Sequence, residues 1–304
     1  MKLFHLPSAD GKSTLACYRT ECKNPQALLQ ISHGMCEHFK RYASFATFLA
    51  RRGVLVFGHD HLGHGATAPS QKELGFTASG GGADFLVEDV HALSLHMKNE
   101  YPDLPLFLFG HSMGSFIARE TVARHPQTYH AAIFCGTGGP DMPVGAGKLL
   151  ARLLMLFFGE RHRSPLLKRI SFAGYNKRYT DVETSVDWLT RDSDTVAAYQ
   201  ADPLCGYTFT LRGYHDLFTL VEWVSRKDWA ERLPKSIPYL VVSGEMDPVG
   251  GWGQGVKKVA DRMVAAGLNT TFRLYPDMRH EILNELEFER VWEELELWIK
   301  TFCP

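Results

Sequence analysis

Residues 110–114 read Gly-His-Ser-Met-Gly, and the serine at their centre could act as a nucleophile. The apolar run 104–109 before them is typical of a buried strand, and the apolar residues from Met113 onward recur at helical spacing. A serine between a strand and a helix, with a glycine two residues before it and another two residues after it, is typical of a nucleophile elbow. The glycines have a steric reason, because side chains in so tight a turn would clash with the neighbouring strand and helix. We therefore interpret Ser112 as the candidate nucleophile.

An acid and a histidine follow this serine along the chain. A serine hydroxyl needs a base that accepts its proton, and the base needs a carboxylate that fixes its tautomer. The chain contains 14 histidines, so their positions relative to predicted strands must select one. Asp247 follows a predicted strand over 237–242 and His280 follows another over 271–275, which places both at the carboxyl edge of a parallel sheet. The order Ser112, Asp247, His280 is the order found in α/β-hydrolases.

Neighbouring residues are weaker candidates for these roles. Glu245 is the alternative acid, while Asp277 has the residue type that turns favour. His111 is adjacent to the serine in the chain, so its side chain should point elsewhere. The chosen residues also have simpler explanations, as a helix cap for the serine and as turn residues for the histidine and the aspartate. The strand–turn–helix context and the chain order favour the catalytic interpretation.

Two backbone N–H groups are needed to hold the oxyanion that forms when a carbonyl is attacked. One should belong to Met113, the residue after the serine. The other should come from the loop that follows the first predicted parallel strand, where Gly34 allows the backbone to turn, and we assign it to Met35. His33 is expected to fix this loop rather than to act on the substrate.

Strand and helix patterns alternate along most of the chain. An Asp-Gly pair at 10–11 indicates a hairpin within residues 3–20. Asp84 is a candidate N-cap for a helix over 85–100. The other predicted strands and helices cover 27–32, 42–52, 53–57, 131–135, 214–224, 256–266 and 286–302. This alternation predicts an α/β fold with a mostly parallel sheet and helices on both faces.

The alternation stops between residues 138 and 212, where the sequence predicts no strand. We interpret 138–212 as a helical cap inserted into one core, which is formed by residues 1–137 and 213–304. The sequence shows no internal repeat and no low-complexity segment that would divide the chain further.

The most apolar stretch of the predicted cap is 149–158. A helix that is apolar nearly all round should be buried on most of its sides, so packing against the core is expected. The same stretch could also line a site for an acyl chain and touch lipid surfaces. We assign the acyl contact to Leu153, Leu156 and Phe157.

Five motifs make the chain similar to a known superfamily. The chain resembles the α/β-hydrolases, in the branch of monoacylglycerol lipases and bacterial lysophospholipases, which includes serine-aminopeptidase-like members. The motifs are His-Gly-Met-Cys-Glu-His at 33–38, Asp-His-Leu-Gly-His-Gly at 60–65, Gly-His-Ser-Met-Gly at 110–114, Ser-Gly-Glu-Met-Asp at 243–247 and Arg-His-Glu at 279–281. The resemblance implies a serine hydrolase that needs no cofactor. Met35 and Cys36 are larger than the residues usual after the His-Gly pair, which predicts a narrower mouth of the acyl pocket.

The bulk composition is that of an ordinary globular protein. The formal net charge is −1, so no charge imbalance favours a nucleic-acid partner. The N-terminus lacks the apolar region of a signal peptide, and no stretch is long and apolar enough to span a bilayer. The six cysteines show no zinc-binding spacing, and we expect reduced thiols in a cytoplasmic protein.

Two other ligand classes are disfavoured. His59, His61 and His64 could suggest zinc, but no further set of cysteines or carboxylates completes a ligand pattern, and a structural loop is expected. The glycines at 80–82 and 63–65 do not match a dinucleotide-binding or P-loop pattern. No metal and no nucleotide is therefore expected. We expect the thiol of Cys36 to be buried and inert rather than to line the site.

The sequence therefore predicts hydrolysis of carboxylic esters with an apolar acyl chain, of the monoacylglycerol or lysophospholipid type, through an acyl-enzyme. The predicted partners are a small-molecule ester or lipid and, transiently, a membrane surface touched by the cap. A peptidase or amidase on the same residues is one alternative, and its amine anchor would be an acidic cap residue, Glu160, Asp181, Glu183 or Asp187. A non-catalytic binding protein of the same fold is the other alternative.

Overall fold

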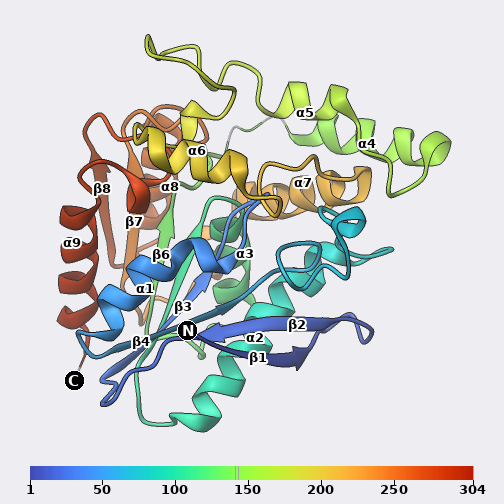
Figure 1. The fold of residues 1–304 in the computed structure, drawn as a ribbon. Coiled ribbons are helices and arrows are strands. Elements are labelled where there is room, and N and C mark those ends of the chain that lie inside the picture. The colour runs from blue at the N-terminus through green and yellow to red at the C-terminus, as the bar shows by residue number, and fades with distance from the viewer. Residues whose placement is uncertain (141, 143, 304) are drawn as a thin grey trace.

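A computed structural model describes residues 1–140, 142 and 144–303. Its centre is an eight-stranded sheet with the strand order β1-β2-β4-β3-β5-β6-β7-β8 (Figure 1). The pairs β1–β2 and β2–β4 are antiparallel, and every later pair is parallel. The predicted α/β fold with a mostly parallel sheet is confirmed.

The strands lie close to their predicted positions. They are β1 (Lys2–Pro7), β2 (Thr14–Arg19), β3 (Ala27–Ser32), β4 (Val54–His59), β5 (Leu106–His111), β6 (Ala131–Cys135), β7 (Tyr239–Gly244) and β8 (Thr270–Tyr275). The α-helices are α1 (Ala43–Ala50), α2 (Gly82–Glu100), α3 (Met113–Arg124), α4 (Val144–Phe158), α5 (Pro165–Ser171), α6 (Ser193–Ala201), α7 (Leu211–Ser225), α8 (Gln254–Ala265) and α9 (Phe288–Thr301). The N-cap of α2 is Gly81 in a left-handed conformation, so the prediction that Asp84 caps this helix is wrong. Asp84 lies instead in the first turn, where it faces Arg124.

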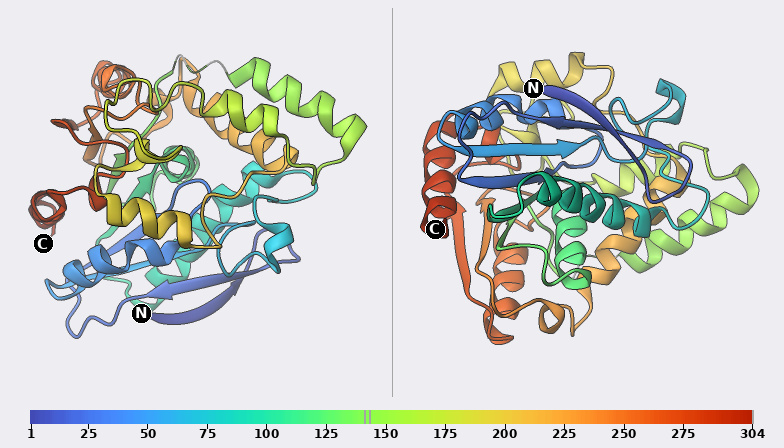
Figure 2. Two further views of the ribbon diagram at one scale, coloured as in Figure 1. Left: turned by 45° about the horizontal axis from the view of Figure 1, so that its top comes forward. Right: turned by 90° about the horizontal axis from the view of Figure 1, so that it is seen from below.

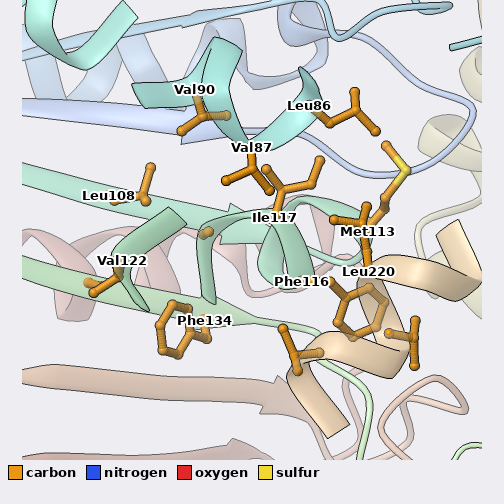
Figure 3. Packing of buried hydrophobic residues seen from close by; sticks show 14 of the residues in the cluster. Leu86, Val87, Val90, Leu108, Met113, Phe116, Ile117, Val122, Phe134 and Leu220 are labelled. Carbon is orange, nitrogen blue, oxygen red and sulfur yellow. The ribbon is translucent and has the colours of Figure 1, made fainter. Parts of the chain in front are cut away.

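Alternate residues of the strands enter two apolar cores, one on each face of the sheet. Phe107 and Phe109 of β5 pack with α1 and α9, whereas Leu106 and Leu108 pack with α2, α3, α7 and α8. Figure 3 shows the second core, where Val87 of α2 faces Ile117 of α3 between the two helices. Helices therefore cover both faces, as predicted, and the buried strands read as continuous apolar runs.

Three α-helices separate β6 from α7 in the described part of the chain. They are α4, α5 and α6, and the part of this segment that the structure describes contains no strand. In both Figure 1 and Figure 2 (left), α4 lies beside α7, away from the sheet.

The expectation that the apolar stretch 149–158 is buried on most of its sides is wrong. Ala151 is the buried residue of α4, and Leu150, Leu154 and Met155 are partly buried against the core. The opposite side of the helix is solvent-exposed, and Leu156 and Phe157 are 76% and 80% exposed. The helix packs on α7 through one side only, so its other apolar residues have no protein layer above them.

The helix that follows the serine approaches β3 very closely. A Cβ atom added to Gly114 would lie 2.0 Å from the carbonyl oxygen of Ser32 and 2.5 Å from that of His33. Backbone atoms cannot move away as the end of a flexible side chain can, so a glycine is required at this contact. The turn before α3 therefore depends on a residue without a side chain at position 114.

Gly114→Ala should destabilise the protein by several kcal/mol, on the order of the largest effects of single core substitutions, or prevent its folding. Gly145→Ala is the matched control, because a Cβ at Gly145 in α4 meets no atom within 4 Å. The control should be neutral or stabilising by up to about 1 kcal/mol. Chemical denaturation of both variants checks this, and an equal stability of Gly114→Ala and wild type would contradict the steric argument.

Candidate functional site

Ser112 occupies the sharp turn between β5 and α3, as its sequence context predicts. Its backbone angles are φ 54° and ψ −122°, a conformation that few residues other than glycine adopt. The N–H group of Ser112 donates a hydrogen bond of 2.9 Å to the carbonyl oxygen of Cys135, which ties the turn to the end of β6. The serine is the N-cap of α3, but its side chain makes no capping hydrogen bond. The side chain is partly exposed, so its hydroxyl is not consumed by the helix.

Asp247 and His280 meet at the same edge of the sheet. The Nδ1 atom of His280 lies 3.0 Å from Oδ2 of Asp247, and both side chains are buried. Asp247 also accepts hydrogen bonds from the Ser243 hydroxyl and from the N–H of Val249, each 2.8 Å long. Burial opposes ionisation of this carboxyl, but the charge and hydrogen bond of His280, with these two donors, hold the pKa of Asp247 below its ordinary value. An ionised carboxylate therefore faces the imidazole.

Glu245, Asp277 and His111 do not take part in the contact between Asp247 and His280. Glu245 is exposed at the start of the turn after β7. Asp277 has φ 61° and lies in a turn before His280, in accord with its interpretation as a turn residue. The Nδ1 atom of His111 lies 3.0 Å from the hydroxyl of Tyr42, and its Nε2 lies 3.3 Å from the backbone carbonyl of His280.

The imidazole of His280 lies close to the backbone that supports Ser112. A Cβ atom added to Gly136, the residue after Cys135, would lie 3.0 Å from Cε1 of His280. The loop after β3 approaches from the other side, because a Cβ atom added to Gly34 would lie 3.2 Å from the Cβ of Ser112. The structure thus brings together the serine, the histidine and the loop that contains Met35. Met113 begins α3, so its N–H belongs to the first turn and is free of the α-helical ladder.

Glu37 holds the loop after β3 in place. Its Oε1 accepts hydrogen bonds from the N–H of Gly34 (2.5 Å) and from the Tyr42 hydroxyl (2.7 Å). Burial would raise the pKa of Glu37, but the hydrogen bond to His111 and the charge of Arg41 hold it well below its ordinary value. The same contact with Glu37 raises the pKa of His111, although burial opposes this.

Arg41 joins this loop to the segment that contains the histidine. Its guanidinium binds Glu37 at 2.7 Å and binds Glu281 with two hydrogen bonds of 2.6 and 2.7 Å. Glu281 is the residue after His280, so one buried ion cluster fixes both sides of the site. Bidentate guanidinium–carboxylate contacts of this kind impose a defined geometry.

The histidines at 33, 59, 61 and 64 form a second buried cluster. Nε2 of His33 accepts a hydrogen bond of 3.0 Å from the N–H of His61, and Nε2 of His59 lies 3.2 Å from Nδ1 of His61. Burial lowers the pKa of His33 to about 4 and those of His59 and His64 to about 3. These neutral rings hydrogen-bond to one another and to the backbone, in accord with the expectation that His33 fixes its loop. The thiol of Cys36 is buried, as expected, and burial raises its pKa.

Residues 23–287 match the model of the family described as serine aminopeptidase, S33. The match covers most of the chain. The chain belongs to this family. This agrees with the α/β-hydrolase resemblance of the sequence motifs.

Several known proteins are similar to the chain over most of their length. The monoglyceride lipase of Homo sapiens is 29% identical over 97% of this chain and 89% of its own. The monoacylglycerol lipase of Mycolicibacterium smegmatis is 28% identical over 91% of this chain and 89% of its own. The structure of a highly thermostable carboxyl esterase from Bacillus coagulans, in complex with glycerol, superposes with a TM-score of 0.93 and 30% identity, covering 100% of this chain and 99% of the esterase.

Sequence reasoning missed the contact between residues 187–190 and the segment that contains His280. The rings of Trp188 and His280 are 5.0 Å apart between centroids, and the N–H of His280 donates to the Trp188 carbonyl at 3.3 Å. Arg279 donates to the carbonyls of Asp187 and Thr190 at 2.8 and 3.3 Å. Arg279 precedes His280 in the Arg-His-Glu motif at 279–281, so the sequence contained a signal for it. Trp188 had none, because only the folded chain brings it there.

Proposed function

We propose that this member of the serine aminopeptidase, S33 family hydrolyses carboxylic esters of the monoacylglycerol type through an acyl-enzyme. The observation that carries the proposal is the 3.0 Å contact between His280 and Asp247, buried beside the strained turn of Ser112. The similarity to monoglyceride lipases and to a carboxyl esterase over nearly the whole chain supports the same chemistry. The reaction needs no cofactor.

In this mechanism Ser112 attacks the ester carbonyl while His280 takes its proton and then passes it to the leaving alcohol. Asp247 keeps the imidazole in the correct tautomer and stabilises its cationic form. The N–H groups of Met35 and Met113 bind the oxyanion, because both belong to segments that border the serine. Water then attacks the acyl-enzyme by the same route in reverse. The hydrogen bond between Glu37 and Gly34 supports this arrangement by fixing the loop of Met35.

The structure gives little support to an amine-binding peptidase. Glu160 pairs with Arg212, and Asp181 pairs with Arg279 at 2.6 Å. The carboxylate of Asp187 accepts hydrogen bonds from Thr184 and from nearby backbone N–H groups. Glu183 is exposed. Three of the four candidate anchors therefore have partners within the protein, so we favour the ester substrate.

We further propose that residues 138–212 act as a cap that meets the lipid. The outer side of α4 and the following α5 expose large apolar side chains, namely Leu149, Leu153, Leu156, Phe157, Phe158, Leu166 and Ile170. Residues 144–171 contain six Lys or Arg and one Glu. An apolar surface with basic residues is typical of protein segments that lie on a membrane interface. Leu153, Leu156 and Phe157 would then contact the acyl chain as it leaves the lipid.

No helix in the described part of the chain combines the length and apolar character needed to cross a bilayer. All six cysteines are unpaired in the structure. Free thiols are typical of a reducing compartment, so we propose the cytoplasm as the location.

The acid role can be tested by comparing two substitutions. Asp247→Asn should keep the fold and lower kcat by roughly 10^4-fold, because an amide favours the wrong histidine tautomer. Glu245→Gln is the matched control and should leave kcat within about threefold of wild type, since exposed side chains away from the site have small effects. Steady-state rates on p-nitrophenyl butyrate measure both. The opposite ranking would give the acid role to Glu245.

Substrate class is tested by rates on fatty-acyl esters and on aminoacyl p-nitroanilides. The esters should have a kcat/KM at least about 100-fold higher, because a site without a partner for a charged amine discriminates against it strongly. A preference for the anilides would overturn the ester proposal while leaving the nucleophile assignment intact.

The cap proposal predicts a chain-length effect. Each buried methylene contributes about 0.8 kcal/mol, so kcat/KM should rise by up to about tenfold per pair of carbons until the acyl site is filled. Replacing Leu153, Leu156 or Phe157 singly by Gln should flatten this rise and spare acetate esters. Leu297→Gln is the control, because Leu297 is also exposed but lies on α9. Equal losses on acetate and long-chain esters would show that the three residues do not contact the acyl chain.

A further inference from the structure

Three side chains with metal-binding atoms meet where the loop after β3 touches the segment after α6. Nε2 of His38 lies 2.8 Å from Oδ2 of Asp202. A ligand atom from each of His38, Asp202 and Cys205 lies within 4.8 Å of the other two. His38 is 164 positions from Asp202 and 167 positions from Cys205, so the fold brings it to the other two residues.

Imidazole nitrogen, carboxylate oxygen and thiolate sulfur are the donor types that zinc binds. Zinc–ligand bonds of about 2.0–2.3 Å in a tetrahedron place neighbouring donor atoms about 3.3–3.7 Å apart. The three donor atoms lie within 4.8 Å of one another, so shifts of about 1.5 Å or less in their separations would give that arrangement. A water molecule could complete the tetrahedron, because the Asp202 side chain is 31% exposed and gives access from solvent.

The surroundings of these three side chains are compatible with a bound cation. His38 and Cys205 are buried, and burial raises the pKa of the Cys205 thiol, so an ion must displace its proton. The positive charge of Arg41 acts on both Cys205 and Asp202, and Glu37 and Glu281 neutralise it. The N–H of Leu204 donates to the second oxygen of Asp202 at 2.8 Å, which orients the carboxylate.

We propose that His38, Asp202 and Cys205 form a binding site for a divalent transition-metal ion of the zinc type. Binding forms a metal–sulfur bond and releases the thiol proton to solvent, with no change of oxidation state. The ion would join the segment after α6 to the loop that also contains Gly34 and Met35. These segments already touch, since the N–H of Gly206 donates to the carbonyl of Cys36 at 3.1 Å. The metal ion would therefore hold these two segments together. The proposal does not depend on the ester substrate.

A second group of possible ligands allows a sharp comparison. Glu88, His91 and His125 also have ligand atoms within 4.8 Å of one another, but they offer no sulfur. The rings of His91 and His125 are stacked with an interplanar angle of 6°, so their in-plane lone pairs lie in parallel planes, which disfavours convergence on one ion. A metal bound through a thiolate therefore distinguishes the Cys205 site from this one.

The test is a Co²⁺ titration of the full-length protein after treatment with a chelator. Wild type should develop a thiolate-to-cobalt charge-transfer band that saturates at one equivalent, is removed by Zn²⁺, and is accompanied by a rise in Tm. Cys205→Ser should abolish the band, and His38→Gln should weaken binding at least about tenfold, while its amide can keep the contact with Asp202. Cys36→Ser is the matched control, because it removes a neighbouring buried thiol that lies outside the set. It should leave the band intact.

The proposal fails if wild type shows no thiolate band at millimolar Co²⁺, if the band persists in Cys205→Ser, or if it disappears in Cys36→Ser. Cobalt binding without a thiolate band that is lost in His125→Gln would assign the ion to the second group and would also overturn the proposal. If Cys205→Ser does not fold, the affinity of His38→Gln decides, and binding as tight as in wild type would exclude the site.

Discussion

The backbone of Ser112 is the constraint on which the rest of the structure depends. Its angles of φ 54° and ψ −122° are costly for a residue with a side chain, by about 1–3 kcal/mol. The turn is maintained by the hydrogen bond from Ser112 to Cys135 and by the close approach of Gly114 to the end of β3. Both contacts come from strands that flank β5 in the sheet. The ends of the parallel strands therefore impose the backbone conformation that exposes the hydroxyl of Ser112.

Two buried charge clusters fix the other components relative to this turn. Asp247 orients His280 from the end of β7, while Arg41 bridges Glu37 and Glu281 across the site. Buried ion pairs contribute little net stability compared with apolar packing, but removing one partner is costly. Each carboxylate here accepts several hydrogen bonds, so the clusters define one geometry rather than a range of them. The precision of the site is thus a property of the charged residues, and the stability of the fold comes from the two apolar cores.

Sequence reasoning succeeded where the signal is local. The apolar runs located the strands within a few residues, and the glycines around Ser112 indicated the elbow, because both features follow from backbone sterics. The choice of Asp247 over Glu245 as the partner of His280 also agrees with the structure, since the turn after β7 buries Asp247 and leaves Glu245 exposed. The roles of these residues in catalysis remain predictions.

The remaining features depend on tertiary contacts that no local pattern encodes. An apolar helix can be buried within the protein or can face a lipid. Only the packing of α4 on α7 showed that Phe157 is exposed. Trp188 reaches His280 from nearly 100 residues away, and His38 meets Cys205 across an even larger separation in the sequence. The N-cap of α2 was misassigned because Gly81 in a left-handed conformation ends the preceding turn before Asp84 is reached.

The central claim is that Ser112 is the nucleophile activated by His280 and Asp247. Labelling with a fluorophosphonate probe, followed by peptide mass spectrometry, tests it most directly, because the probe forms a covalent bond with an activated serine. We expect one adduct per chain on the peptide that contains Ser112, no adduct in Ser112→Ala, and labelling slowed by about 10^3-fold or more in His280→Ala. An adduct on another serine, or labelling of Ser112→Ala at the wild-type rate, would contradict the account.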